Sequence, residues 1–338
     1  MKLKRIGIDL AKHVFQVHGV DEAEQVVVRK RLTRSQMLRF FVQVEPTLMG
    51  MEACGGSHYW ARELMKMGHT VKLVPPPYVK PYVKTNKNDA NDAEAICEAV
   101  SRPTMRFVPV KGVEQQALQS LHRVRERVVK ARTALVNEIR GLLGECGVVL
   151  GLGVATVRRS LPRIVEDAEN SLCPPMRALL NELYAELVVS DERLKHLDVQ
   201  VKQHARSDEG ARRIQQLDGV GPVVASAVVS SIGDGRQFKS GREFAAWLGI
   251  VPRQHSSGGK DQLGGISKRG DSRLRTLLIH GARAAVKASV HKTDRRSQWV
   301  KALTARRNKN IATVALANKN ARIIWAMLVR EEDYRAAA

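Results

Sequence analysis

Two long amphipathic stretches in the middle of the chain constrain its fold more than any other feature. Apolar side chains recur at steps of three and four residues through 114–143, with Arg and Glu on the other faces. Alternating steps of four and three run through residues 176–201, where every such position except Ser190 is apolar. Because an α-helix turns once in about 3.6 residues, this spacing predicts two long helices, separated by the proline- and glycine-bearing residues 144–175.

The two helices divide the chain into three expected regions, residues 1–110, 111–208 and 209–338. The middle region is either an ordinary helical hairpin that packs on itself or a coiled-coil arm that dimerises, and the spacing is compatible with both. At 338 residues the chain exceeds the usual size of one compact core, which also favours more than one domain.

The first hundred residues alternate between strand-like and helix-like patterns. Expected strands are residues 5–11, 14–21, 24–32, 47–53 and 69–76, and expected helices are residues 35–44 and 57–67. Three successive strands followed by alternating helices and strands predict an α/β domain, in which helices cover a mixed sheet. From residue 209 onward the pattern indicates a compact, mainly α-helical domain.

A strong excess of positive charge indicates a polyanionic partner. The net charge is +22, and residues 209–338 contribute +14 of it, from 24 Lys and Arg against 10 Asp and Glu. Nucleic acid is therefore the expected partner, held mainly by its phosphates in the last third of the chain. Only 4% of residues are aromatic, so base stacking is not expected to be the main source of affinity.

Cysteine spacing and hydropathy exclude several classes of protein. The four cysteines lie far apart, which argues against a zinc knuckle and against a disulfide framework. No run approaches the roughly 20 apolar residues that cross a bilayer, and the N-terminus lacks a secretory pattern. We expect a protein of a reducing cytoplasm, without a membrane partner.

Two acidic residues occupy strands that are otherwise apolar. Asp9 lies in "RIGIDLAKHVFQV", and Glu52 ends the strand in "LMGMEACGG". A carboxylate in such a strand is costly to bury without a counter-ion, and a metal ion is the simplest one. Taken alone, either acid is more typical of a cap or a turn.

Asp89 and Asp92 change this balance. They lie three residues apart at the start of an expected helix and so project from one face. Either residue could cap the helix, but both cannot cap the same end. Together with Asp9 and Glu52 they supply the four carboxylates that a site for two Mg²⁺ ions requires, with the ions flanking a scissile phosphate.

Gly219 and Gly221 separate two apolar helical runs in "IQQLDGVGPVVASAVV". This pattern predicts a helix-hairpin-helix motif, in which the glycine turn lets backbone N–H groups at a helix N-terminus approach a phosphate. A bare GxG is a weak signal, and an ordinary helix turn is the alternative. The surrounding positive charge favours nucleic-acid contact.

A glycine-rich loop at residues 256–265 carries two adjacent serines, Ser256 and Ser257. Such a stretch is usually only a flexible turn. Here basic residues lie within it and follow it, so they could steady a phosphate while a serine hydroxyl attacks. The basic residues are Lys260, Lys268, Arg269, Arg273 and Arg275.

The order of the four acids resembles that of the RuvC branch of RNase H-like nucleases. The strings "IGIDLAK", "MEACGGSHYWARELMKMGH" and "KNDANDAEAI", with "LGIVPRQHSSGGK" and "ISKRG" further on, are similar to the DEDD transposases of the insertion sequence 110 family, relatives of the Piv/MooV invertases. The resemblance spans residues 9 to about 283. It implies that Asp9, Glu52, Asp89 and Asp92 bind metal and that one serine is the nucleophile, with Ser256 and Ser257 both fitting.

The same resemblance implies recombination through a covalent serine intermediate, guided by a structured bridge RNA encoded beside the gene. Two active sites acting on two duplexes also favour a homodimer or homotetramer. A RuvC-like structure-selective endonuclease is the alternative, since it needs only the four acids. A basic nucleic-acid-binding protein without catalysis is the third possibility.

Overall fold

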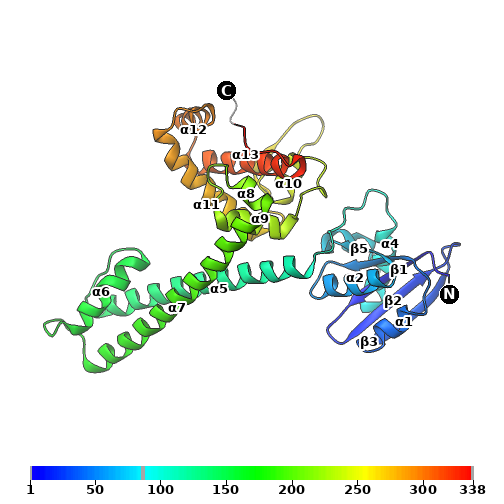
Figure 1. Ribbon diagram of the computed structural model, residues 1–338, viewed down its shortest axis with the longest axis horizontal. Coiled ribbons are helices and arrows are strands. Elements are labelled where there is room, and N and C mark those ends of the chain that lie inside the picture. The colour runs from blue at the N-terminus through cyan, green and yellow to red at the C-terminus, as the bar shows by residue number, and fades with distance from the viewer. Residues whose placement is uncertain (1, 85–87, 336–338) are drawn as a thin grey trace. The chain divides into compact units, whose positions relative to one another are not determined.

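The computed structural model describes residues 2–84 and 88–335. The chain forms two compact units, Met1–Val113 and Glu114–Ala338, and the second holds both the long helices and the C-terminal helices. Figure 1 shows the succession of elements along the chain. No helix of the described residues combines the length and the apolar character needed to cross a membrane.

The first unit is built on a five-stranded mixed sheet of order β3-β2-β1-β4-β5. β1 pairs antiparallel with β2, which pairs antiparallel with β3, whereas β1, β4 and β5 run parallel. The strands are β1 (Arg5–Leu10), β2 (Val14–Val20), β3 (Val26–Thr33), β4 (Leu48–Glu52) and β5 (Thr70–Val74). All five expected strands are therefore confirmed, and the mixed α/β class of this unit with them.

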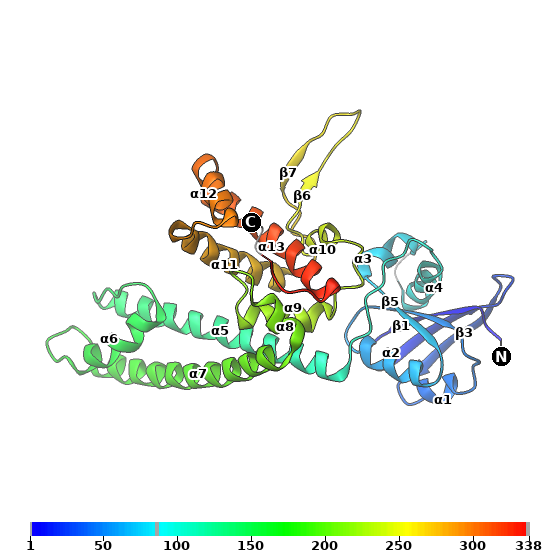
Figure 2. The ribbon, with the colours of Figure 1, turned by 45° about the horizontal axis from the view of Figure 1, so that its top comes forward.

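Helices cover both faces of this sheet because side chains alternate along each strand. Ile6 and Ile8 of β1 are fully buried on the face covered by α1 (Met37–Phe41) and α2 (Ser57–Lys66). The opposite face receives α4 (Asp89–Val100), which Figure 2 shows on the other side of the sheet from α1 and α2. The short α3 (Pro76–Val79) and the 3-10 turn Lys80–Tyr82 lead towards α4.

The second unit begins with the two long helices that the spacing predicts. They are α5 (Val113–Glu145) and α7 (Pro174–Ser207), which lie side by side in Figures 1 and 2. Leu135 and Ile139 of α5 are buried with Leu180 and Leu187 of α7. A further helix, α6 (Val154–Glu166), packs on α7 in the segment that was expected only to separate them.

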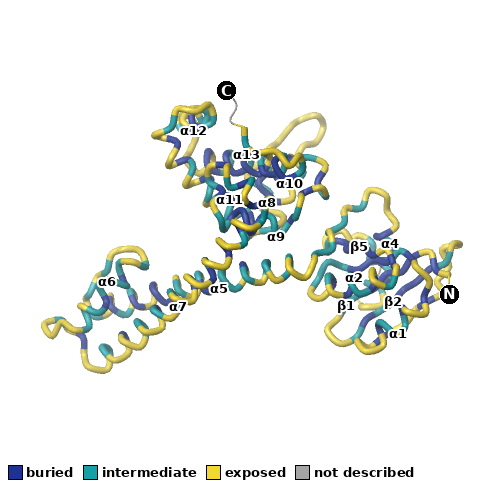
Figure 3. The backbone as a smooth tube through the Cα atoms, viewed as in Figure 1, coloured by how far each residue is buried: buried dark blue, intermediate teal, exposed yellow. Residues whose placement is uncertain are grey.

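The rest of the second unit is mainly helical, as expected. It comprises α8 (Glu209–Ile214), α9 (Pro222–Ile232), α10 (Gly241–Trp247), α11 (Ser272–Ala288), the 3-10 turn Ser289–His291, α12 (Arg295–Arg306) and α13 (Lys309–Arg330). Between α10 and α11 the chain forms a hairpin of β6 (Pro252–Gln254) and β7 (Leu263–Ile266). Figure 3 shows buried residues concentrated where these helices meet, while the hairpin is exposed.

Candidate active site

Asp9 and Glu52 lie at neighbouring strand ends. Gly7 of β1 pairs with Gly50 of β4, and Ile8 pairs with Met51. The same parallel register places Asp9 beside Glu52, one residue further on. Because side chains alternate between the faces of a sheet, both carboxylates share the face of the two glycines, which is the face that α4 covers.

α4 carries the other two acids at its N-terminal end. Its N-cap is Asn88, whose side chain accepts a hydrogen bond from the Asn91 amide at 2.8 Å. Asp89 is the first helical residue and Asp92 lies one turn later, so neither is the N-cap. Capping therefore explains neither acid.

The two glycines allow α4 to approach the sheet closely. A β-carbon at Gly7 would lie 2.1 Å from the Ala93 carbonyl oxygen and 2.4 Å from the Cys97 amide nitrogen. A β-carbon at Gly50 would lie 2.9 Å from the β-carbon of Val100. The backbone of α4 thus rests directly on β1, which brings its first turn over the strand ends.

Electrostatics show that the four carboxylates are neighbours. The pKa of Asp9 is raised to about 6, first by burial and then by the negative charges of Asp89, Asp92 and Glu52. Burial, followed by Glu52 and Asp9, also raises the pKa of Cys54. The structure therefore brings together all four acids that the sequence singled out, at a point of negative potential.

The four carboxylates suit a cation, but they do not form a closed coordination site. Mutual repulsion and partial burial disfavour the charged form of Asp9, and a divalent cation removes both costs. Carboxylate oxygens are also the ligands that Mg²⁺ prefers. Among the described residues, however, no three Asp, Glu, His or Cys side chains are gathered tightly enough to hold a metal ion as they stand.

A cavity of about 340 Å³ lies at the ends of β1 and β4. Its lining includes Leu10 and Cys54, the neighbours of Asp9 and Glu52, together with Lys12 and Arg34. The Arg34 guanidinium lies over the Trp60 ring, 5.0 Å from its centroid. Lys12 and Arg34 place two positive charges in this cavity, which suits an anion such as a phosphate. Neither cation stands out in the sequence, although Lys12 follows Asp9 by three residues.

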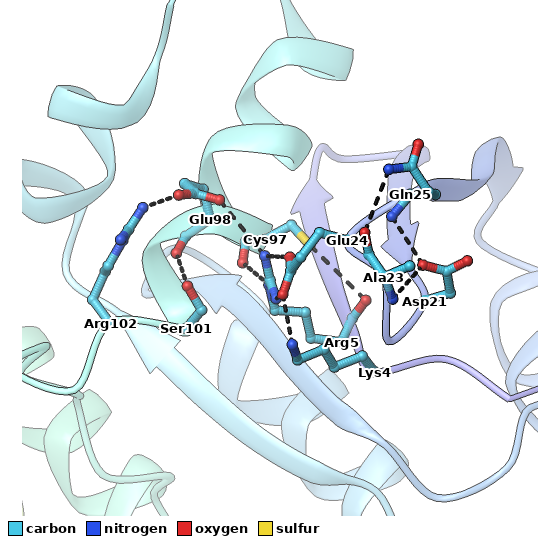
Figure 4. Close-up of polar contacts among 10 residues, drawn as sticks. All are labelled: Lys4, Arg5, Asp21, Ala23, Glu24, Gln25, Cys97, Glu98, Ser101 and Arg102. Carbon is cyan, nitrogen blue, oxygen red and sulfur yellow. Dashed lines mark hydrogen bonds and ion pairs between the residues drawn. The ribbon is translucent and has the colours of Figure 1, made fainter.

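A buried arginine ties α4 to the start of β1, as Figure 4 shows. The Arg5 Nε donates to the Cys97 carbonyl oxygen at 3.0 Å, and its guanidinium also pairs with Glu24 and, at 3.6 Å, with Glu98. Hydrogen bonds from Arg5 and from Lys4 lower the pKa of Glu24 to about 2, so the pair stays charged. This network holds the C-terminal half of α4, where Cys97 also meets Gly7 and Val100 meets Gly50.

The two serines lie in the exposed hairpin of β6 and β7, which Figure 2 shows extending from the C-terminal helices. The sequence indicated a loop from residue 256 to 265, but Leu263–Ile266 forms β7, so the loop is shorter than expected. The His255 amide donates to the Gln262 carbonyl at 2.9 Å, and the Lys260 amide donates to the Ser257 carbonyl at 3.1 Å. The loop is thus a hydrogen-bonded turn.

The hydroxyl groups of Ser256 and Ser257 differ in their surroundings. The Ser256 Oγ accepts from the Gln254 side chain at 2.9 Å and from the Gln262 amide at 3.3 Å, and it donates to Asp261 at 3.0 Å. Among the described residues, no hydrogen bond involves the Ser257 hydroxyl. Ser256 therefore shapes the hairpin, while the Ser257 hydroxyl is exposed beside it.

The expected phosphate-binding residues of the second unit fall into two groups. Lys260, Lys268 and Arg269 are exposed, as is Gly221, the N-cap of α9. Arg273 and Arg275 are half-buried: burial lowers the pKa of Arg273, and Arg275 donates to the Leu248 carbonyl at 3.0 Å.

Gly219 has a packing role of its own. Its φ is +85°, and a β-carbon there would lie 2.5 Å from the Gly281 carbonyl oxygen of α11. This close approach to α11 and the left-handed backbone both require glycine at the turn between α8 and α9.

Comparison with known proteins places the chain in a family. Residues 6–147 match a DEDD transposase model for IS110 elements, and residues 211–298 match the model described as transposase IS116/IS110/IS902 family. The chain is 58% identical over 336 residues to a Pseudomonas aeruginosa protein named as a probable family 20 transposase, covering 99% of both chains. It is 49% identical over 336 residues to the transposase for insertion sequence element IS1111A of Coxiella burnetii, covering 99% of this chain and 92% of that one. The chain belongs to the IS110 family of transposases.

The two matches divide the site residues of this IS110-family transposase between them. The first covers all four carboxylates, and the second covers the turn of Gly219 and Gly221 together with the serine hairpin. A DEDD transposase domain has an RNase H-like α/β fold and depends on a divalent metal. The chain is accordingly an enzyme that acts on DNA in transposition.

Proposed function

We propose that this transposase cleaves and rejoins DNA strands by using Mg²⁺ ions held by Asp9, Glu52, Asp89 and Asp92 together with a serine nucleophile. The observation that carries the proposal is geometric: the strand register sets Asp9 beside Glu52, and α4 packs on the same face with Asp89 and Asp92 in its first turn. The raised pKa of Asp9 agrees with this, because three further carboxylates and partial burial make a cation the natural counter-charge there. Two ions between these acids would stabilise the charge on the attacking and the leaving oxygen. Lys12 and Arg34 would hold the adjoining phosphate in their cavity.

Ser257 is the better nucleophile of the two serines. A hydroxyl oxygen has two lone pairs, and both lone pairs of Ser256 accept hydrogen bonds within the hairpin. In the proposed step the Ser257 oxygen loses its proton and bonds to phosphorus, the bond from phosphorus to the sugar oxygen breaks, and that oxygen takes up a proton. Attack by the hydroxyl of a second DNA strand reverses these changes and frees the serine.

Backbone contacts would hold the nucleic acid. Exposed Lys260, Lys268 and Arg269 can neutralise phosphates around the hairpin, and the α8–α9 turn would act as a helix-hairpin-helix with its N–H groups at Gly221. The side chains of Arg273 and Arg275 are half-buried and would hold this surface in position.

We further propose a three-part organisation, with a DEDD domain in residues 1–110, a coiled-coil region in 111–208 and a serine-bearing domain in 209–338. The exposed apolar side chains Val189 and Val199 on α7 are consistent with a dimer or tetramer assembled through the long helices. A bridge RNA encoded by the element would select the DNA partners.

Reconstitution tests this function directly. The full chain, with the RNA that copurifies with it and DNA carrying element ends and target, should recombine these DNAs in Mg²⁺ and should stop on chelation. Sequencing that RNA would show whether it pairs with both DNAs. Mg²⁺-dependent cleavage that releases free 5′-phosphates without joining would instead identify a structure-selective nuclease.

A further inference from the structure

The C-terminal helices enclose a groove that none of the residues discussed above explains. Its volume is about 1820 Å³. Residues of α13 line its floor, residues of α12 line one side, and the base of the β6–β7 hairpin lines part of the other. Figure 2 labels these three elements. The groove therefore begins beside the strands that carry the serine turn.

The lining of the groove is strongly cationic. Seven Lys and Arg residues line it against three acids, and one of those acids, Asp294, caps α12 by accepting from the Ser297 amide at 3.0 Å. Burial, followed by the charges of Arg296, Arg295 and Arg322, lowers the pKa of Lys319. Positive charges thus repel one another inside the groove, and an anion would relieve that repulsion.

The floor is also apolar, which distinguishes this groove from an ordinary basic surface. Ile311 is 54% exposed, and Val314 and Ile323 extend the same lining along α13. Trp299 of α12 also lines the groove, half-buried against α11 and α13, with the Lys319 ammonium 4.4 Å from its ring centroid. Unpaired bases can stack on an aromatic ring and contact apolar side chains, while their phosphates pair with cations. This groove supplies all three kinds of group.

We propose that this groove binds a short stretch of single-stranded DNA released during strand cleavage and exchange. A duplex presents mainly phosphates to a protein surface and would leave the apolar floor without a partner, whereas an unpaired strand offers base faces as well. The choice of DNA rests on the proposed function, because the groove adjoins the hairpin whose serine is assigned to attack DNA. The binding itself does not require cleavage.

Fluorescence anisotropy on the full chain in EDTA tests the proposal without catalysis. The probes are a labelled 12-nucleotide DNA, its duplex and the RNA of the same sequence. Each neutralised phosphate of a single strand contributes about 0.7 to the salt slope, so K319Q/R322Q should lower the slope for single-stranded DNA by about 1.4. W299L should weaken single-strand binding roughly five- to a hundredfold, and W299F should remain close to wild type because it keeps an aromatic ring.

K202Q is the matched control, since Lys202 is an exposed cation on α7 outside the groove, and it should leave single-strand affinity unchanged. Iodouracil in the DNA should crosslink to a peptide within residues 295–326. Unchanged affinity and slope in the groove variants, or equal losses on duplex and single strand, would overturn the proposal. Tighter binding of the RNA with the same sensitivity to these variants would overturn the assignment to DNA. Neither result bears on the recombination activity of the wild-type chain. The proposed function is tested separately, by the recombination assay.

Discussion

Gly7 of β1 and Gly50 of β4 are partners across two parallel strands, and the carboxylates of Asp9 and Glu52 follow each of them by two residues. Because neither glycine has a side chain, the sheet is flat at this point and α4 rests on it. The strand acids follow two residues later along each strand. The distance between strand carboxylates and helix carboxylates is set by this contact. The glycines are therefore positioning residues for the carboxylate set.

We expect Gly7→Ala to destabilise the first unit by about 2–3 kcal/mol, because the new methyl group would meet the backbone of α4. Urea unfolding measures the loss. The variant should also bind Mg²⁺ more weakly, since α4 must shift away from Asp9. Gly112→Ala is the control, because a β-carbon there meets nothing within 4 Å. Wild-type stability of Gly7→Ala would show that α4 does not rest on β1 as described.

Removing single carboxylates should separate catalysis from binding. Asp9→Asn, Glu52→Gln, Asp89→Asn and Asp92→Asn should each lower recombination about a thousandfold or more, because a catalytic metal ion contributes several kcal/mol. Nucleic-acid affinity measured in EDTA should persist, since no Lys or Arg that contacts phosphates is removed. The metal-free Asp9→Asn protein should gain thermal stability at neutral pH, where the charge on Asp9 is costly.

Glu63→Gln provides the comparison for these variants, because Glu63 lies on α2 and pairs with Lys66 at 2.7 Å. It should recombine DNA like the wild type. Wild-type recombination in any two of the four carboxylate variants would remove these acids from the metal site.

Stability of the second unit should fall in mild acid because of a buried histidine. His122 on α5 is 3% exposed, and its Nε2 lies 2.9 Å from the Ser226 hydroxyl of α9. Burial, then the charges of Arg273, Arg125 and His204, lower its pKa from 6.5 to about 4. Between these values the unfolded chain binds more protons, so the stabilisation present above pH 6.5 is lost as the pH falls towards 4, by up to about 3 kcal/mol.

Unfolding of His122→Gln at pH 7 and pH 5, followed by circular dichroism, measures that loss. The variant should show a smaller difference between the two pH values than the wild type. His196→Gln replaces an exposed histidine on α7 and should retain the full difference. An unchanged pH dependence in His122→Gln would assign the effect to other groups.

The regular elements of the fold could be predicted because their burial repeats locally. The spacing of Leu135, Ile139, Leu180 and Leu187 follows directly from one buried face, and β1 is a short apolar run because it is covered on both faces. α6 was missed because it buries only Val157 and Leu161 completely and contains Pro162. Strands β6 and β7 were missed because they are three and four residues long and expose nearly every side chain.

The four acids could be singled out from the sequence, whereas the geometry around them could not. The acids stand out because they interrupt apolar strands or share a helical face. That Gly7 meets Cys97, or that Arg34 lines a cavity with Lys12, depends on contacts between residues far apart in the sequence. No local pattern encodes such contacts.

The serine mechanism predicts a covalent protein–DNA adduct. A hydroxyl oxygen that replaces the leaving sugar oxygen must attach the protein to one DNA end, whereas activated water would release a free phosphate. Denaturing the reaction midway on a nicked substrate should therefore trap an adduct whose peptide contains "QHSSGGK". Ser257→Ala should abolish it, because the Ser257 oxygen is the one without hydrogen bonds among the described residues.

Ser256→Ala should reduce the adduct but not eliminate it, because that hydroxyl holds Gln254, Asp261 and the Gln262 amide in the hairpin. An adduct that survives Ser257→Ala but not Ser256→Ala would exchange the two roles. Mixing the Ser257→Ala chain with the Asp9→Asn chain adds a further test: recombination returns only if one subunit can supply the serine and another the carboxylates. Full recombination by the Ser256→Ala/Ser257→Ala chain without any adduct would leave the carboxylates as the whole catalytic apparatus and make the hairpin a DNA clamp.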